Sequence, residues 1–501
     1  MTFNEDVKPF IKRFTNNGYF YIYDVNTKQV VEVEKPVYDI IHDYVGNDYE
    51  GIVKKYSTCF DRSVIKKSVE KIKNAQAKYG LFSNFRPKMI SMGIRDAGSI
   101  KKLHNTYGLN QMLLELTEDC NLNCRYCQTS GKYAPTVSMR SEMSQKTCKK
   151  MVDFFCANVQ GVEKPAISFY GGEPLLKFDL IRETVEYINK TYGRGKFIFS
   201  ITTNGTLLNK EIIDFFIKND FLLAVSLDGP EKVNDRYRVT RNGKGTFHTI
   251  MNNLGLIKKY NSSYFSRNVS ISCVLAPPFD NIDDILNFFS TNETLSEKKT
   301  KVGIRSSLVE TKETSFIEDF GLEKSMKEYP SIFDKFVKRI KAAILAHDLS
   351  SLTIEKTSIY SILGKIARRS ITSLHDHERP VGACHIGQRR FFVRANGDFF
   401  VCERSANDYK IGCADKGFDY ETIAAYYRKQ EEVLAECKNC WAINLCERCW
   451  AVIGKLDIFN GEEKEKFCSY QKAIIEKAIK VYTELLREDS NCLKVFKNTV
   501  Q

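Results

Sequence analysis

The chain has 501 residues and a formal charge of +13, with 43% hydrophobic and 27% charged residues. This composition excludes a disordered or collagen-like protein, and at ~150 residues per domain the length predicts several folded units. No apolar run reaches the ~18 residues of a membrane span, and "MTFNEDVKPFIKRF" lacks a secretory core, so we predict a cytoplasmic protein without a membrane partner.

The positive charge is spread along the chain rather than gathered in one block. Lysines occur in short groups such as "KKY", "KKLH" and "EKKTK", and none is interleaved with aromatic residues. A nucleic-acid groove would concentrate both residue types. We therefore interpret the charge as a Lys-rich surface and predict no nucleic-acid partner.

The N-terminal region begins with two β-rich runs, "YFYIYDV" and "QVVEVEK", around the turn-prone "NTK". Helical patterns follow in "PVYDIIHDYV" and "RSVIKKSVEKIKNAQAKYG". The pattern ends near "FRPKMISMGIRDAGS", a plausible linker. We assign residues 1–95 to this first domain.

From "QMLLELT" onward, strand-like runs alternate with helix-like segments. The strand-like runs are "AISFY", "FIFSIT", "LLAVSL" and "VSISCVL". Such alternation predicts βα units with a parallel sheet, here a partial (β/α)6 barrel over residues 96–310. Its chemistry is expected in the loops at the C-terminal ends of the strands.

The rest of the chain divides into two further regions. The stretch from "TNETLSEKKTK" to "IARRSITSLHDHERP" is predicted to be mostly helical, and residues 311–380 are assigned as a helical bridge. Residues 381–501 are Cys-rich and end in the amphipathic "QKAIIEKAIKVYTELLRE".

Sixteen cysteines in a chain without an export signal indicate metal binding or catalysis, because reducing cytosol does not maintain structural disulfides. Ten of them form two groups along the chain. The other six are expected to be small buried hydrophobic residues: Cys59, Cys148, Cys156, Cys273, Cys413 and Cys492.

The first cysteine group, Cys120, Cys124 and Cys127 in "EDCNLNCRYC", follows the first predicted barrel strand. Dense thiolates select zinc or iron-sulfur clusters. A structural zinc site normally has four ligands, and no local His or fourth Cys follows. Three ligands leave an iron of a cubane cluster open, which indicates catalysis.

This motif resembles the CxxxCxxC hallmark of the radical S-adenosylmethionine (SAM) enzymes, and three further segments support the resemblance: "SFYGGEPLL", "TTNGTLL" and "VSLDGPEKVNDRYR". The resemblance implies a SAM-binding 4Fe-4S cluster on the three cysteines. It also implies reductive cleavage of SAM to a 5'-deoxyadenosyl radical that abstracts a substrate hydrogen. An isolated "GGEP" is also typical of a simple turn.

The same resemblance implies the residues that contact SAM. Gly171 and Gly172 would let the backbone approach a ligand, and Glu173 would accept from the methionyl amine. Ser226 and Arg238 would lie near the SAM carboxylate. The family usually has His-Asp-x-x-Arg where this chain has Asn234 and Asp235 before Arg238, so Arg236 and Arg241 are rivals for that role.

The second cysteine group consists of Cys384, Cys402, Cys437, Cys440, Cys446, Cys449 and Cys468. Two CxxC pairs alone are consistent with a zinc ribbon. Seven cysteines, however, do not divide into complete four-ligand zinc sites. Their order resembles the SPASM extension of radical SAM enzymes, which implies two auxiliary 4Fe-4S clusters and three clusters in all.

The resemblance also implies how these cysteines are shared. Cys437, Cys440, Cys446 and Cys468 would hold one cluster, whereas Cys384, Cys402 and Cys449 would hold the other with one ligand missing. Cys446 and Cys449 are two residues apart, where the usual pattern has three. Either Cys413 completes the second cluster, or an iron stays open for a substrate thiolate. The open site is favoured, because catalytic metal sites keep an exchangeable position.

SPASM-type enzymes act mostly on peptides, and the N-terminal region resembles the winged-helix-like element by which such enzymes capture a precursor's leader through strand addition. A purely structural cap is the alternative. "CHIGQRRFFVRANGDFFVCER" resembles the corresponding segment of thioether-forming maturases. The predicted partners are a Cys-containing precursor peptide and an electron donor such as flavodoxin or ferredoxin.

The leading interpretation is a radical SAM oxidoreductase that installs thioether crosslinks of the sactipeptide or ranthipeptide type in a ribosomally made peptide. The alternatives are a formylglycine-forming sulfatase maturase, a carbon-carbon crosslinking maturase, or a zinc-dependent nucleic-acid-binding protein.

Overall fold

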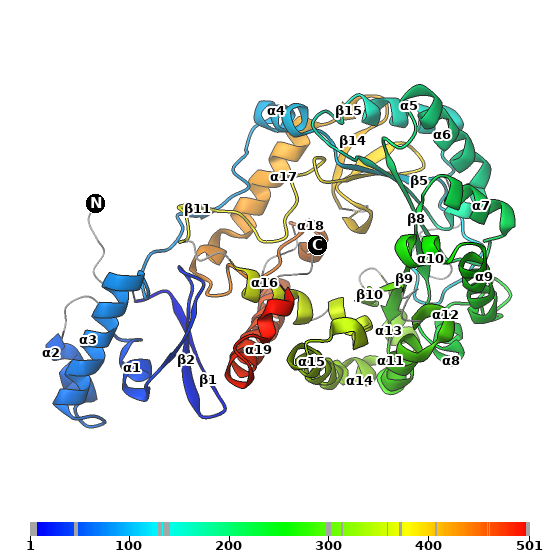
Figure 1. Ribbon diagram of the computed structural model, residues 1–501. Coiled ribbons are helices and arrows are strands. Elements are labelled where there is room, and N and C mark those ends of the chain that lie inside the picture. Colours follow the sequence, from blue (N-terminus) through cyan, green and yellow to red (C-terminus); the bar gives the residue numbers. More distant parts are fainter. Residues whose placement is uncertain are drawn as a thin grey trace.

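The structure is a computed structural model that describes residues 8–44, 49–128, 133, 141–296, 302–311, 314–357, 359–369, 373–405, 408–457, 459 and 461–496. Figure 1 shows an N-terminal unit, an arc of strands with helices on its outer side, and a C-terminal region that closes the arc. No helix within the described ranges is long and apolar enough to cross a membrane.

The N-terminal unit is a three-stranded antiparallel sheet with three helices. The sheet order is β1-β2-β3, and the predicted strands are β2 and β3. A strand that the sequence analysis missed, β1, precedes them. Gly80 ends α3 in the left-handed conformation, with φ 63°. The bounds are β1 Ile11–Asn16, β2 Tyr19–Asp24, β3 Val30–Val33, α1 Lys35–Ile40, α2 Tyr49–Tyr56 and α3 Arg62–Tyr79.

The expected linker after this unit is partly ordered by pairing. Strand β4, Met89–Ile90, runs parallel to β11, His377–Glu378. Helix α4, Ala97–Tyr107, follows, and its first turn is capped by the Asp96 side chain, which accepts from the Ser99 amide. The linker therefore connects the N-terminal unit to both the barrel and the C-terminal region.

Six parallel strands, β5 to β10 in sequence order, confirm the partial (β/α)6 barrel. Helices α5, α6, α7 and α9 lie on its outer side (Figure 1). The strands are β5 Gln111–Glu115, β6 Ala166–Tyr170, β7 Ile198–Thr203, β8 Leu222–Ser226, β9 Val269–Leu275 and β10 Gly303–Leu308. The helices are α5 Gln145–Cys156, α6 Phe178–Thr191, α7 Lys210–Lys218, α8 Glu231–Tyr237, α9 Phe247–Tyr260, α10 Ser262–Asn268, α11 Ile282–Thr291 and α12 Glu293–Ser296.

The sixth strand corrects one expectation, because β10 lies in the stretch predicted to be mostly helical. It is the edge strand of the sheet and alternates between half-buried and exposed residues. Such a strand has little hydrophobic signal, and its parallel pairing with β9 places it in the barrel. Helices do follow: α13 Phe316–Asp319, α14 Glu323–Met326, α15 Tyr329–Leu345 and α16 Ile359–Arg368.

The C-terminal region continues the barrel sheet. Strand β12 pairs parallel with β5, and β13, β14 and β15 extend the sheet antiparallel to a total of ten strands. The predicted C-terminal helix is α19, which also contains Cys468. The bounds are β12 Phe391–Val393, β13 Asp398–Phe400, β14 Lys410–Cys413, β15 Gly417–Phe418, α17 Tyr420–Val433, α18 Trp450–Ile453 and α19 Gly461–Glu488.

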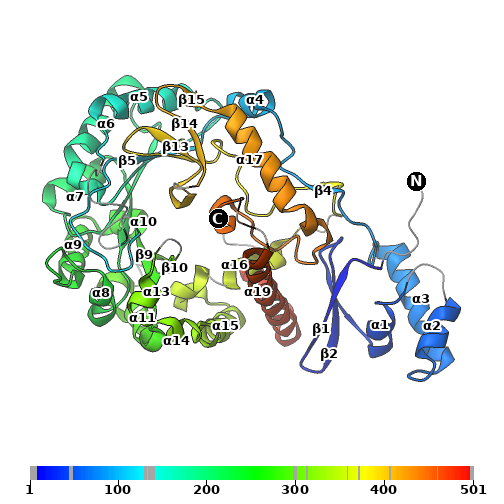
Figure 2. The ribbon, with the colours of Figure 1, turned by 180° about the vertical axis from the view of Figure 1, so that it is seen from behind.

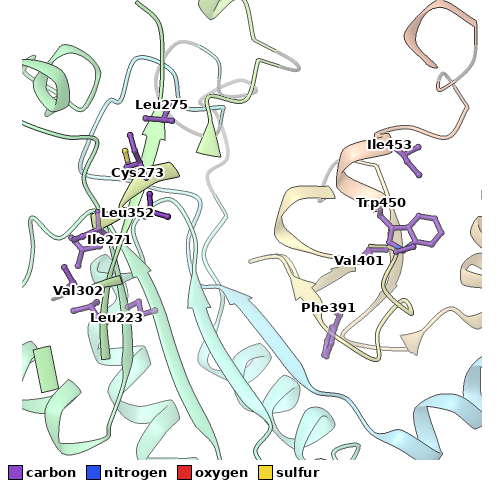
Figure 3. Packing of buried hydrophobic residues seen from close by; sticks show 14 of the residues in the cluster. Leu223, Ile271, Cys273, Leu275, Val302, Leu352, Phe391, Val401, Trp450 and Ile453 are labelled. Atoms are coloured by element: carbon purple, nitrogen blue, oxygen red, sulfur yellow. The ribbon is translucent and has the colours of Figure 1, made fainter. Parts of the chain in front are cut away.

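One hydrophobic core joins the barrel to the C-terminal region. Figure 3 shows barrel residues such as Leu223 and Ile271 on one side, and Phe391 and Trp450 on the other. All four belong to the same cluster of buried side chains. The two regions therefore share a core rather than meeting at a thin interface.

Helix α19 fastens the N-terminal unit to the rest of the chain. It lies beside β1 in Figures 1 and 2. The Asn16 side chain donates to the Lys480 carbonyl at 3.0 Å, and Lys12 forms an ion pair with Glu476 at 2.9 Å. The β1 edge is thus covered by α19.

Candidate active site and auxiliary cysteine sites

Cys120, Cys124 and Cys127 occupy the loop that follows β5, at the C-terminal end of the barrel. The loop is held through its backbone: the amides of Asn123 and Arg125 donate to carbonyls of Val239 and Tyr237 at 2.8 and 2.9 Å. Cys120 and Cys124 are each only 8% exposed. The loop therefore offers three closely spaced thiols in a largely dry environment.

Burial disfavours the ionised form of the Cys120 and Cys124 thiols and so raises their pKa values. With a smaller contribution from the neighbouring Cys127, burial raises the pKa of Cys120 to about 11 and of Cys124 to about 12. Metal ligation requires deprotonated thiolates and releases their protons. The site is therefore suited to a soft metal centre that supplies the missing positive charge.

The two glycines of "GGEP" contact the cysteine loop. A Cβ on Gly171 would lie 2.4 Å from the Thr117 carbonyl oxygen, and one on Gly172 would lie 2.2 Å from the Asp119 carbonyl oxygen. The Gly172 amide donates to the Thr117 carbonyl at 2.8 Å. These glycines let the loop after β6 lie directly against the start of the cysteine loop; their approach to a ligand stays a prediction.

Glu173 is fully buried and joins the loop after β6 to the end of β7. Its carboxylate accepts from the Leu175 amide at 3.0 Å, the Thr203 hydroxyl at 2.7 Å and the Asn204 amide at 2.7 Å. Burial raises its pKa to about 7, and these three donors oppose that rise. The carboxylate is held rigidly beside the cysteine loop, and its contact with a SAM amine stays a prediction.

Asn204, in "TTNGT", links Glu173 to the thiols. Asn204 directly follows β7, and its backbone amide donates to Glu173 Oε2 at 2.7 Å. Its side-chain amide lies 3.8 Å from Cys120 Sγ and donates to Asn121 Oδ1 at 2.8 Å. This contact was not singled out from the sequence. The signal available there was its position directly after a barrel strand.

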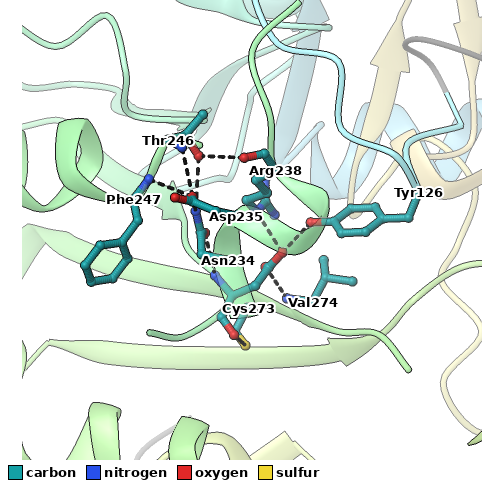
Figure 4. Close-up of polar contacts among 9 residues, drawn as sticks. Tyr126, Asn234, Asp235, Arg238, Thr246, Phe247, Cys273 and Val274 are labelled. Atoms are coloured by element: carbon teal, nitrogen blue, oxygen red, sulfur yellow. Dashed lines mark hydrogen bonds and ion pairs between the residues drawn. The ribbon is translucent and has the colours of Figure 1, made fainter. Parts of the chain in front are cut away.

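Arg238 is buried and paired with Asp228. The Arg238 Nε donates to Asp228 Oδ2 at 2.9 Å, and Tyr126 donates to the same oxygen at 2.5 Å (Figure 4). The Val274 amide donates to Asp228 Oδ1 at 2.8 Å. Asp228, which the sequence analysis did not select, thus anchors Arg238 beside the cysteine loop, since Tyr126 lies between Cys124 and Cys127.

The structure separates Arg238 from its two rivals. Arg236 points to the Pro278 carbonyl and to Asp280, and Arg241 donates to the Cys120 carbonyl at 2.6 Å and to Asp119 at 2.6 Å. Arg238 is 7% exposed, and its charge lowers the pKa of Cys124 against the effect of burial. Of the three, it is therefore the buried cation at the thiols.

The residues that replace the family's usual His-Asp pair have a structural role. Asn234 donates to Thr246 Oγ1 at 3.1 Å, and the Asp235 carboxylate accepts from the amides of Thr246 and Phe247 at 2.8 and 2.9 Å (Figure 4). These bonds fix the loop between α8 and α9. Ser226 is the last residue of β8, where a strand-end side chain can face the site.

The second cysteine group separates into two sets. Cys437, Cys440, Cys446 and Cys468 line one pocket, together with Arg448 and apolar side chains. Burial, together with the thiols of Cys440, Cys437 and Cys468, raises the pKa of Cys446 to about 12. Four thiols thus face one enclosed space.

The other three cysteines lie together elsewhere. Burial and Cys449 raise the pKa of Cys402, while burial and Cys384 raise that of Cys449. Arg389 donates to Cys384 Sγ at 3.4 Å, and the Trp450 indole donates to the Cys384 carbonyl at 3.0 Å. These three cysteines are the set for which the sequence resemblance implies a cluster with only three protein ligands.

Cys413 lies at the far end of the β13-β14 hairpin. It pairs with Asp398, whereas Val401, next to Cys402, donates to the Tyr409 carbonyl at 3.3 Å. Strand β13 ends at Phe400, so Cys402 lies in the segment between β13 and β14, away from the end of the strand pair that holds Cys413. This placement argues against Cys413 as the missing ligand.

The remaining scattered cysteines mostly match the expectation. Cys148, Cys273 and Cys492 are buried and Cys156 is half-buried, but Cys59 is exposed. The prediction of a buried Cys59 was wrong, because it lies in the turn that follows α2, outside the helical face that packs on the core.

The three sets of thiols fit iron-sulfur clusters better than single metal ions. Among the described residues, no three His, Cys, Asp or Glu side chains converge on one metal position. A zinc site needs its ligands within about 2.3 Å of one ion, whereas each thiolate on a cubane binds a different iron. The buried thiols, and the buried Arg448 guanidinium beside one set of them, suit a larger, negatively charged group.

Comparison with known proteins agrees with this arrangement. Residues 114–290 match the sequence model of the radical SAM superfamily. A cysteine-type anaerobic sulfatase-maturating enzyme of Clostridium novyi is 29% identical over 37% of this chain and 49% of its own length. An uncharacterised protein of Methanocaldococcus jannaschii, MJ0907, is 35% identical over 31% of this chain and 50% of its own length.

The fold comparison extends further along the chain. A structure of anSMEcpe with bound AdoMet covers 78% of this chain and 96% of its own, with a TM-score of 0.55 and 19% identity. The chain spans about half the length of the curated relatives it matches. Residues 114–290 are thus a radical SAM domain, the catalytic domain of an enzyme superfamily, with homology to SPASM-type maturases.

Replacing Gly172 with Ala should destabilise the site, because the new Cβ would overlap the Asp119 carbonyl, 2.2 Å away. Overpacking of this kind costs ~1–3 kcal/mol. We expect a lower melting temperature and weaker SAM binding. Gly255→Ala is the matched control, since that helical glycine has no atom within 4 Å of an added Cβ; an equal loss in both variants would contradict the backbone-contact explanation.

Asp228→Asn should cost ~3–5 kcal/mol of folding free energy, because it leaves the buried Arg238 without its carboxylate. Chemical denaturation of the two proteins measures the difference. Asp280→Asn is the control, since Asp280 is 61% exposed and its pair with Arg236 is solvent-screened. Similar losses for both substitutions would argue against a special role for Asp228.

Proposed function

We propose that the chain is a radical SAM maturase that installs intramolecular Cys thioether crosslinks in a ribosomally synthesised precursor peptide. The observation that carries the proposal is the division of ten cysteines into a set of three beside the radical SAM motifs, a set of four and a second set of three. Homology to sulfatase-maturating enzymes supports a peptide or protein substrate.

In this proposal, Cys120, Cys124 and Cys127 hold the cluster that binds SAM, which supplies a 5'-deoxyadenosyl radical when it is reductively cleaved. Glu173 orients the amine of SAM and Arg238 its carboxylate, because both are rigidly held beside the thiols. Tyr126, Tyr237 and Phe316 pack around the cysteine loop and exclude water. Exclusion of water protects a reactive intermediate from side reactions.

The set of four cysteines would complete the ligands of one auxiliary 4Fe-4S cluster, and the set of three would leave one iron of the other open. Cys384 lines a cavity of about 430 Å³ that also contains Arg379, His385 and Arg389. A substrate sulfur could reach this site through the cavity. The pairing of Cys413 with Asp398, at the other end of β13 from Cys402, supports the open position.

Thioether formation requires an electron acceptor in addition to the radical. One C–H bond and one S–H bond break, one C–S bond forms, and the substrate loses two electrons and two protons. The hydrogen atom taken from carbon carries one of each; the second proton goes to solvent, and the second electron requires a nearby acceptor. The cofactor set and a partner such as flavodoxin or ferredoxin fulfil this requirement in the proposal.

We place leader capture at the free edge of β3. Strand β3 ends the N-terminal sheet and pairs within the described part of the chain only with β2. The Asp24 amide donates to the Gln29 carbonyl, so by the alternation of antiparallel pairs the backbone groups of Val30 and Glu32 point away from β2. An extended leader could add there as a fourth strand.

The sulfatase-maturase alternative is favoured by the sequence match to such an enzyme. Against it, the structural match covers 96% of that neighbour but only 78% of this chain, which leaves about a fifth of this chain without a counterpart. The N-terminal unit is a candidate for that extra part. A zinc-dependent nucleic-acid-binding protein gains no support from a radical SAM domain.

Anaerobic purification should give about twelve irons per chain, four for each cubane, and dithionite should drive formation of 5'-deoxyadenosine from SAM. Replacing Cys120, Cys124 and Cys127 together with Ala should remove about four irons and abolish 5'-deoxyadenosine. Zinc without acid-labile sulfide, or SAM cleavage by the triple variant, would contradict the proposal.

Cys402→Ala and Cys413→Ala form a matched pair within this experiment. Both remove one thiol from the same hairpin, but only Cys402 lies with Cys449. We expect iron loss for Cys402→Ala and an unchanged iron content for Cys413→Ala. Loss of a cluster's worth of iron from the second variant would make Cys413 a ligand and close the open site.

Glu32→Pro should weaken leader binding, because it removes an outward amide without breaking the β2-β3 ladder. One backbone hydrogen bond is worth ~0.5–1.5 kcal/mol, so we expect a loss of about threefold to tenfold. Fluorescence anisotropy with a labelled leader of the precursor measures it. Glu32→Ala, which keeps the amide but loses the ion pair with Arg487, is the control; equal affinity in both variants would exclude strand addition at this edge.

A further inference from the structure

Arg448 is a buried cation without a carboxylate partner. It lies between Cys446 and Cys449 in the sequence, and its side chain is among the largest fully buried ones, with 1% exposure. Its Nη2 donates to the Ile443 carbonyl at 2.7 Å, but its Nε is buried and has no hydrogen-bond partner. Among the described residues, no carboxylate is in ion-pair contact with it.

Such a group needs a compensating negative charge. Arginine stays protonated in proteins, and an isolated buried charge costs several kcal/mol. The other buried arginine, Arg238, illustrates the usual solution, because Asp228 lies 2.9 Å from it. Nothing equivalent accompanies Arg448 among the described protein groups, so its counter-charge is expected from a bound group.

The surroundings of Arg448 identify that group. It lines the pocket formed by Cys437, Cys440, Cys446 and Cys468, whose remaining wall includes Leu434, Ala442, Phe459 and Phe467. Its charge lowers the pKa of Cys446, against the larger opposing effect of burial. Four thiolates on a 4Fe-4S core give a net negative charge that grows by one unit on reduction. The cation and the thiolates therefore stabilise each other.

We propose that Arg448 is the buried counter-charge of the four-cysteine auxiliary site and raises the reduction potential of the cluster held there. The proposal rests on the cluster assignment of the proposed function. A nearby fixed cation stabilises the reduced, more negative state most strongly in a low-dielectric pocket. Arg448 acts through its field rather than as a ligand.

Lys464 and Lys472 line the same pocket, and Lys464 serves as a control for Arg448 because it has a carboxylate partner. Lys464 forms an ion pair with Glu436 at 2.7 Å, and Glu436 is 84% exposed. The charge of Lys464 is therefore both compensated and screened by solvent. Removing it changes the formal charge of the pocket as much as removing Arg448, but should change the field at the thiols much less.

The test is a redox titration followed by electron paramagnetic resonance. A background with Ala at Cys120, Cys124, Cys127, Cys384 and Cys402 leaves one complete set of ligands. In this background we compare Arg448→Gln, which keeps a donor for the Ile443 carbonyl, Arg448→Lys, which keeps the charge, and Lys464→Gln. Iron and acid-labile sulfide per chain are measured on every sample.

We expect the midpoint potential of Arg448→Gln to fall by at least about 59 mV, a tenfold change in the one-electron equilibrium. Arg448→Lys and Lys464→Gln should stay close to the background. If Gln prevents cluster assembly but Lys permits it, the requirement for the charge is also established. The proposal is overturned if the Gln variant keeps its iron and its potential, or if Gln and Lys both lose the cluster.

The same samples separate this proposal from the proposed function. A background protein that contains zinc and no sulfide overturns both. An iron-sulfur cluster whose potential does not respond to Arg448→Gln overturns only the role of Arg448. If the midpoint potential falls equally in Lys464→Gln and Arg448→Gln, the effect comes from the total charge of the pocket. That result would also overturn the proposed role of Arg448.

Discussion

The contact between two glycines and the start of the cysteine loop is the constraint on which the candidate active site depends. The amides of Gly172 and Glu173 donate to the carbonyls of Thr117 and Asp119, both at 2.8 Å, so the loop after β6 lies directly on the loop after β5. A side chain at Gly171 or Gly172 would separate the two loops. Because Glu173 then bonds to the end of β7, three neighbouring strand ends become one rigid support for the thiols.

Buried charge is the second organising feature, and the two arginines that are buried among the described residues differ in their partners. Arg238 has a carboxylate partner, Asp228, whose other oxygen accepts from β9. Arg448 has only a backbone carbonyl. In a low-dielectric interior, the first arrangement is complete without a cofactor, whereas the second is not. Arg238 is therefore held in place by the protein itself, whereas the charge of Arg448 requires a bound group of opposite charge.

The placement of the N-terminal unit determines which of its sheet edges is available. Helix α19 contacts Asn16 and Lys12 of β1 and thereby covers that strand. The same helix contains Cys468. One helix thus fastens the N-terminal sheet and contributes to the four-cysteine site. Within the ranges that the structure describes, β3 is the edge that no further strand pairs with, and the ends of a sheet expose unpaired backbone groups.

The sequence by itself determined what depends on short-range order. The spacing of Cys120, Cys124 and Cys127 and the alternation of strands and helices are local properties, so both could be read from the sequence. The radical SAM family itself came from the resemblance of these motifs to those of known enzymes. Interleaving of the seven later cysteines into sets of four and three came from resemblance, and the structure brings together the same sets. The exposed edge strand β10 and the first strand β1 were missed, since neither has a strong hydrophobic pattern.

Only the tertiary structure decided what depends on contacts between distant segments. Arg236, Arg238 and Arg241 are equivalent in sequence. Packing directs Arg236 to Asp280, Arg238 to Asp228 and Arg241 to the Cys120 carbonyl. Pairing within a hairpin likewise separated Cys413 from Cys402. The unpaired charge of Arg448 could not be inferred from its neighbours in the chain, because compensation of a buried charge depends on every group that folding brings around it.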